Sequence, residues 1–197
     1  MILLSVGVFI LITLSGRTMI RNSDWKDQYT LLSHDEKISR DDYVQELLYS
    51  VELIKINKYE EAYAHINKAI ALYPQSSEAW TTLGAVYFGQ RKIDKAKEAY
   101  LKAISTGGYY GAYSNLSLLL LQYDKPVHAR EFILKAVKVY PGIDKLWYFL
   151  ILAEYKSGNH DGALVAAKNY YLLRGDSQSY GIYSSLLNNI PLNIILK

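Results

Sequence analysis

The four histidines, His34, His65, His128 and His160, are the side chains best suited to metal binding or acid-base chemistry. They are far apart in the sequence, and no two have the short spacing that a metal site needs. His34 and Asp35 are adjacent, so on a helix or turn they do not face one another, and helix capping is the simpler role. The chain has no cysteine, no phosphate-binding glycine loop and no nucleophile motif. The sequence therefore predicts no catalytic residue, no metal, no cofactor and a protein that is not an enzyme.

Composition points to a folded chain with a large surface. Half of the 197 residues are hydrophobic, which is enough to bury a core. The net charge is only +3, and the 22 basic and 19 acidic residues are spread along the chain, so no nucleic-acid partner is expected. There are 19 tyrosines against 4 phenylalanines, and tyrosine suits shallow grooves because its ring is buried while its hydroxyl reaches water or a partner.

An internal repeat is the strongest signal in the sequence. Alanines recur at Ala62, Ala96, Ala129 and Ala163, which are 34, 33 and 34 residues apart. Around the second of them the chain reads Trp80, Leu83, Gly84, Tyr87, Ala96, Tyr100, Ala103. This order resembles the W-x2-L-G-x2-Y…A-x3-F…A pattern of the tetratricopeptide repeat, in which each unit is a pair of antiparallel helices. Trp147 takes the place of Trp80 in the fourth unit.

The resemblance implies an all-α protein, an α-α superhelix of about four helical hairpins. The repeat units are expected at 43–76, 77–109, 110–143 and 144–177. A capping helix at 179–188 and an apolar tail are expected within 178–197, because Pro191 ends the helical pattern. Small residues at positions such as Gly84 let the two helices of a hairpin approach, and one hairpin alone leaves an apolar face uncovered, so neighbours must stack.

The first twenty residues form a separate apolar element, predicted to be a membrane helix. Met1 to Ser15 carry no charge, although that run is short for a span, which needs about 20 residues. A signal peptide and a buried helix are the alternatives, but the run lacks a basic start, an A-x-A site and a polar face. The helix is either a single anchor or the last of several in a longer protein, with residues 21–42 as a juxtamembrane connector. Arg17 and Arg21 alone would place the following domain in the cytoplasm.

The connector resembles polytopic membrane glycosyltransferases that use lipid-linked sugars and carry C-terminal tetratricopeptide tails. Their R-T-x-x-R-N-x-D-W-x-x-x-x-x-L segment is matched by Arg17, Thr18, Arg21, Asn22, Asp24, Trp25 and Leu31. The resemblance implies that the repeats lie on the non-cytoplasmic side of a membrane, which is the localisation we predict. The catalytic acidic loop of such enzymes is not in this sequence, so transferase activity does not carry over.

The predicted binding site is the concave groove lined by the first helix of each unit. Its predicted contacts are apolar or small, and they are Leu47, Val51, Thr81, Phe88, Ser114, Leu118, Tyr148 and Tyr155. The Lys and Asn clamp of repeats that hold chaperone carboxylates is missing. We therefore predict a membrane-tethered scaffold that binds a protein or peptide, with the groove open to a partner or partly filled by an apolar end of the chain itself. The alternative function is an acceptor-presenting tail of a membrane glycosyltransferase.

Overall fold

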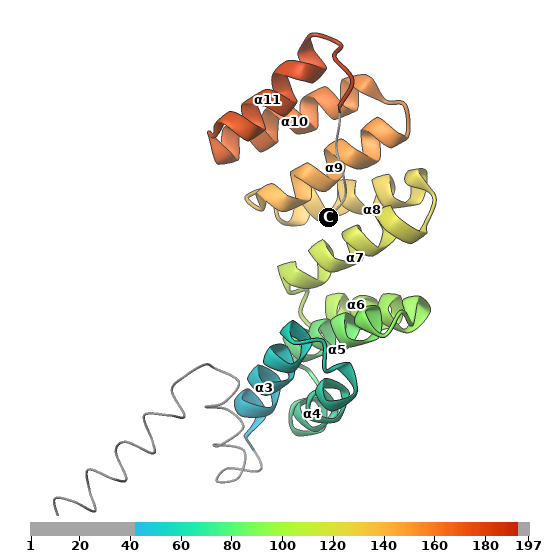
Figure 1. The fold of residues 1–197 in the computed structure, drawn as a ribbon, viewed down its shortest axis with the longest axis vertical. Helices are drawn as coiled ribbons and strands as arrows, with labels where there is room; N and C mark the ends of the chain where they lie inside the picture. Colours follow the sequence, from blue (N-terminus) through green and yellow to red (C-terminus); the bar gives the residue numbers. More distant parts are fainter. Residues whose placement is uncertain (1–41, 193–197) are drawn as a thin grey trace, which may run out of the picture. The chain divides into compact units, whose positions relative to one another are not determined.

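The structure, a computed structural model, describes residues 42–192 and places nine α-helices in them (Figure 1). This confirms the predicted all-α superhelix of repeats. The predicted membrane helix (1–20), nearly all of the connector (21–42) and the end of the tail (193–197) lie outside the described residues. No helix within 42–192 is long and apolar enough to cross a membrane. The chain divides into two compact units, residues 1–74 and 75–197, which we describe separately.

The described part of the first unit is one hairpin, made of α3 (Tyr43–Lys55) and α4 (Tyr59–Leu72). Asp42 starts α3, because its carboxylate accepts a hydrogen bond of 2.8 Å from the Val44 amide. Glu46 is buried within the hairpin and is neutralised across it, since its two oxygens lie 2.6 Å from His65 Nδ1 and 3.2 Å from Lys68 Nζ.

The described part of the second unit contains three hairpins and one further helix. Its helices are α5 (Ser77–Gly89), α6 (Ile93–Thr106), α7 (Tyr110–Tyr123), α8 (Pro126–Val139), α9 (Asp144–Lys156), α10 (His160–Arg174) and α11 (Ser177–Leu187). The first helix of each hairpin contacts the first helix of the next, α5 against α7 and α7 against α9. The second helices of these described hairpins, α6, α8 and α10, do not contact one another. The first helices therefore form the inner, concave side of this unit.

The recurring alanines lie in the buried core of the hairpins. Ala62, Ala96, Ala129 and Ala163 are all fully buried. Gly84 of α5 shows how close the approach is, because a Cβ at that position would lie 2.4 Å from two carbons of the Tyr100 ring on α6. The Trp80 ring of the same hairpin is only partly buried.

Three of the four hairpins turn through a residue with left-handed backbone. Asn57, Arg91 and Gly158 have φ of 60°, 59° and 75°. They occupy equivalent repeat positions, 34 and 67 residues apart (57 to 91, 91 to 158). A glycine takes this conformation readily, while an arginine takes it at a cost of about 1–2 kcal/mol.

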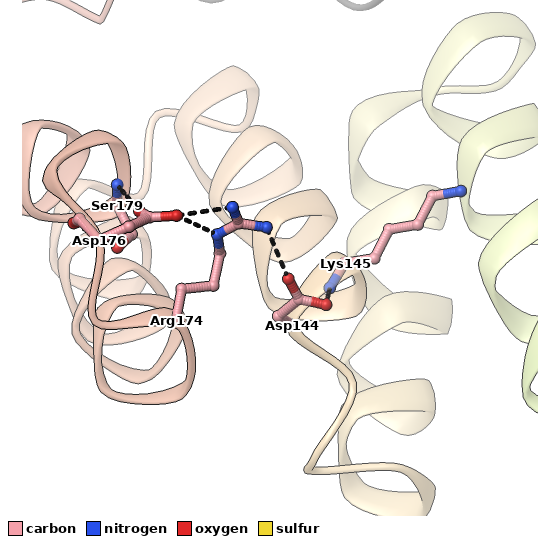
Figure 2. A network of polar contacts seen from close by, with 5 residues as sticks. All are labelled: Asp144, Lys145, Arg174, Asp176 and Ser179. Atoms are coloured by element: carbon pink, nitrogen blue, oxygen red, sulfur yellow. Dashed lines mark hydrogen bonds and ion pairs between the residues drawn. The ribbon is translucent and has the colours of Figure 1, made fainter.

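The last helix, α11, begins at Ser177, two residues before the predicted start, because Asp176 caps it. The Asp176 carboxylate accepts a hydrogen bond of 2.8 Å from the Ser179 amide. Figure 2 shows that Arg174 bridges this cap to the start of α9, with its guanidinium 2.6 Å from Asp176 and 3.1 Å from Asp144. The final turn of α10, the cap of α11 and the start of α9 are thus held together by one arginine.

The contacts of Asp176 with Ser179 and Arg174 predict that the stability contributed by the cap of α11 falls at acidic pH. The Ser179 amide, and then Arg174, lower the pKa of Asp176 from 3.8 to about 2. A carboxylate whose pKa is lower in the folded state stabilises that state above the unfolded pKa, and the contribution is lost as the pH falls through the folded pKa. In thermal unfolding, Asp176→Asn should therefore lower the melting temperature by a constant amount above pH ~4 and by a shrinking amount between pH ~4 and ~2. Asparagine still caps a helix, so a gap that does not change with pH would contradict the role of the charge.

Candidate peptide-binding surface

The predicted groove residues divide between the two units. Leu47 and Val51 belong to α3 of the first unit, where Leu47 is buried and Val51 is partly buried. The other six belong to α5, α7 and α9 of the second unit. The two predicted positions within each helix are seven residues apart in α5 and α9 and four apart in α7, and both spacings place them on one helix face.

Two of the six, Thr81 and Ser114, are buried and offer little surface to a partner. Thr81 is 6% exposed, and its hydroxyl donates to the Ser77 carbonyl of its own helix at 2.7 Å. Ser114 is 4% exposed, and its hydroxyl has no hydrogen-bond partner among the described residues. Because both side chains are buried, the surface available for binding is made by the remaining positions.

Phe88, Leu118, Tyr148 and Tyr155 supply that surface, and we call these four residues the first-helix surface. Phe88 and Leu118 are partly exposed, and the Phe88 ring meets the Tyr123 ring edge-on at 6.1 Å. The surface is therefore apolar at the α5 and α7 positions and has phenol hydroxyls on α9.

The two tyrosines of α9 differ in their surroundings. Tyr148 packs its ring 5.6 Å from Tyr170 of α10, and partial burial raises the pKa of its hydroxyl. Tyr155 is more exposed, at 37%, and its hydroxyl accepts a hydrogen bond of 3.3 Å from the Leu192 amide. After α11 the chain turns back, and Leu192 also packs against the core of the second unit. A segment without regular structure, from the chain's own C-terminal region, thus already lies against this surface.

By sequence alone, either apolar end of the chain could reach the groove, and the structure shows the C-terminal segment at Tyr155. The signal was present in the apolar tail after Pro191, but the pairing joins residues 37 positions apart. No periodic pattern connects two such positions. Within residues 42–192 there is also no group of three or more acidic or histidine side chains arranged to hold a metal ion.

Comparison with known proteins places the repeat in a family. Residues 65–98 match the tetratricopeptide repeat family. Essential for maintenance of the cell wall protein 1 of Saccharomyces cerevisiae is 27% identical over 125 residues, which is 62% of this chain. The chain spans about 14% of the length of that relative.

Solved structures share the fold at low sequence identity. The pilF protein of Pseudomonas aeruginosa superposes with a TM-score of 0.70 at 18% identity, over 90% of this chain and 82% of that one. MamA gives a TM-score of 0.66 at 21% identity, over 84% and 97% of the two chains. YrrB, described as a tetratricopeptide repeat protein with an unusual peptide-binding site, gives 0.60 at 18% identity, over 80% and 82%.

Proposed function

Because this chain is a tetratricopeptide repeat protein, we propose that it is a non-catalytic interaction module that binds an extended apolar polypeptide on the first-helix surface. Repeats of this kind suggest a protein-protein interaction scaffold. The observation that carries the proposal is the hydrogen bond between the Leu192 amide and the Tyr155 hydroxyl. A backbone N–H donated to a surface tyrosine, with a leucine packed beside it, is the type of contact that a bound peptide makes.

The chemistry of the surface favours an apolar peptide over an acidic one. Where a carboxylate clamp would need cationic or amide side chains, α5 and α7 have Thr81, Ser114 and Leu118. Two of these three are buried. The two tyrosines of α9 offer rings with hydroxyls, and tyrosine side chains are enriched among the residues that dominate binding energy in protein interfaces. The peptide-binding site described for YrrB lends support by analogy of fold.

The tether to a membrane is a second part of the proposal, supported by the uncharged run from Met1 to Ser15. With that tether the module would hold its partner beside a membrane, on the non-cytoplasmic side. The alternative, an acceptor-presenting tail of a membrane glycosyltransferase, depends on residues 17–31 and stays a prediction.

The peptide proposal can be tested with the chain's own C-terminal segment as the probe. A chain ending at Asn189 should bind a fluorescein-labelled peptide of residues 190–197, Ile-Pro-Leu-Asn-Ile-Ile-Leu-Lys. We expect Tyr155→Ala and Tyr148→Ala each to weaken that binding by about tenfold, as loss of a well-packed interface tyrosine does. Fluorescence anisotropy measures the dissociation constants.

Tyr180→Ala is the matched control, because Tyr180 is an exposed tyrosine on α11, outside the first-helix surface. It should leave the affinity unchanged. Equal affinities for the parent chain and the Tyr148→Ala and Tyr155→Ala variants would show that the peptide binds elsewhere, and the proposal would fall.

A further inference from the structure

A second concave site lies on the side of the second unit formed by the second helices. It is a pocket of about 510 Å³ lined by α8, α9 and α10, and it shares no residue with the first-helix surface. Its apolar wall includes Trp147 and Leu150, while Arg130 and Glu154 supply charge and Val165 lies at its exposed edge. We call it the outer pocket. Its volume falls within the range of roughly 300–1,000 Å³ that is usual for ligand sites.

The outer pocket differs from its equivalent in the second hairpin at two positions. There the equivalent positions of the hairpin itself, 67 residues earlier, line a pocket of about 320 Å³ to which no preceding helix contributes. There Tyr87 stands where the fourth hairpin has Glu154, and Lys95 stands where it has Gly162. The Lys95 ammonium lies 5.8 Å from the centre of the Tyr87 ring, so a ring and a long side chain occupy that region. The fourth hairpin has a carboxylate and no side chain at these two positions.

The carboxylate of Glu154 is buried but only half satisfied. The residue is 2% exposed, and its Oε2 accepts hydrogen bonds from Arg130 Nε at 2.6 Å and Asn159 Nδ2 at 2.7 Å. No hydrogen bond within the described residues reaches its Oε1. Gly162 keeps space beside this group, because a Cβ there would lie 2.8 Å from Glu154 Oε2. A nearly buried carboxylate with one oxygen that no protein donor reaches favours a ligand that brings a donor.

The charge balance indicates which donor fits. Arg130 already neutralises Glu154, so a second cation would meet a site with no net negative charge. A neutral N–H or O–H donor keeps the ion pair intact and satisfies Oε1. The apolar wall beside it suits a ring, and phenol and indole are the side chains that combine a large apolar body with one donor.

We propose that the outer pocket binds an aromatic side chain with a hydrogen-bond donor, a tyrosine or tryptophan of a polypeptide partner. The ring packs against Trp147 and Leu150, and the phenol or indole donor bonds to Glu154. The inserted ring would fill the space that the Tyr87 ring fills in the second hairpin. This site adds a second point of attachment for a protein partner, independent of the first-helix surface.

Two probes that differ by one hydroxyl test the proposal on the full chain. N-acetyl-tyrosinamide and N-acetyl-phenylalaninamide are titrated while the NMR signals of the Trp147 indole and the Gly162 amide are followed. We expect millimolar binding of the tyrosine probe and about tenfold weaker binding of the phenylalanine probe, because one hydrogen bond to a charged group is lost. Equal binding of the two probes, or no shift at millimolar concentration, would overturn the proposal.

Variants separate the pocket from non-specific binding. Val165→Trp fills the edge of the outer pocket and should abolish the shifts, whereas Val127→Trp, at an exposed valine of α8 outside the pocket, should not. Glu154→Gln should reduce the preference for tyrosine. If circular dichroism shows that Glu154→Gln does not fold, the comparison of Val165→Trp with Val127→Trp still tests the site. NMR shifts that persist in Val165→Trp would refute it. Tyr155→Ala should leave both probes unaffected, which distinguishes this proposal from the one on the first-helix surface.

Discussion

Arg130→Met is expected to lower the free energy of unfolding by about 3 kcal/mol, because it leaves the buried Glu154 without its ionic partner. Breaking a buried pair usually costs about 3–5 kcal/mol, and the low end applies here because the Arg130 side chain is 33% exposed and water can replace part of it. The Asn159 amide would remain as the one hydrogen-bond donor to the carboxylate. Urea unfolding followed by circular dichroism measures the change.

Two further variants test whether the lost ion pair causes the loss of stability in Arg130→Met. Lys138→Met removes a positive charge from the same helix at an exposed residue that forms no ion pair within residues 42–192, and it should change the stability by less than about 0.5 kcal/mol. The double variant Arg130→Met/Glu154→Gln should recover more than ~1 kcal/mol of the loss, because the uncompensated charge is gone. A double variant as unstable as Arg130→Met alone would mean that the arginine acts through packing of its stem.

Gly84→Ala should destabilise the second hairpin by about 2 kcal/mol, although alanine is the better helix former. The added methyl would lie 2.4 Å from ring carbons of Tyr100, a residue only 2% exposed and therefore unable to move aside. Overpacking of this kind costs about 1–3 kcal/mol. Gly181→Ala is the matched control, because a Cβ at this α11 glycine meets nothing within 4 Å and should stabilise by about 0.5–1 kcal/mol.

The other hairpins suggest a second substitution that should compensate for a larger residue at position 84. The two helices of a hairpin use complementary sizes at equivalent buried positions: Ser50 with Ile66, Gly84 with Tyr100, Ser117 with Ile133, and Ile151 with Ala167. The double variant Gly84→Ser/Tyr100→Ile copies the pair of the third hairpin. It should be more stable than the sum of the two single changes predicts, by at least ~1 kcal/mol. Strict additivity would show that these positions do not pack as a pair.

The hairpins and their contacts could be predicted because they depend on local pattern. A small residue at a fixed interval, as at Ala96 and Ala129, marks where paired helices approach, and helical periodicity assigns each side chain to a face. The start of α11 was missed by two residues, because Asp176 caps the helix before the apolar pattern begins. Of the predicted groove positions, Tyr155 is exposed, whereas Thr81 and Ser114 are buried.

The sequence by itself determined the repeat, the helix pairing and the lack of a carboxylate clamp, because each of these is encoded within one period of about 34 residues. Only the tertiary structure decided that Arg130 neutralises Glu154 and that Leu192 reaches Tyr155. These contacts join residues 24 and 37 positions apart, on neighbouring hairpins or beyond the last helix. The physical reason is that they depend on how one repeat stacks on the next and where the chain turns back, and neither leaves a periodic trace in the order of the residues.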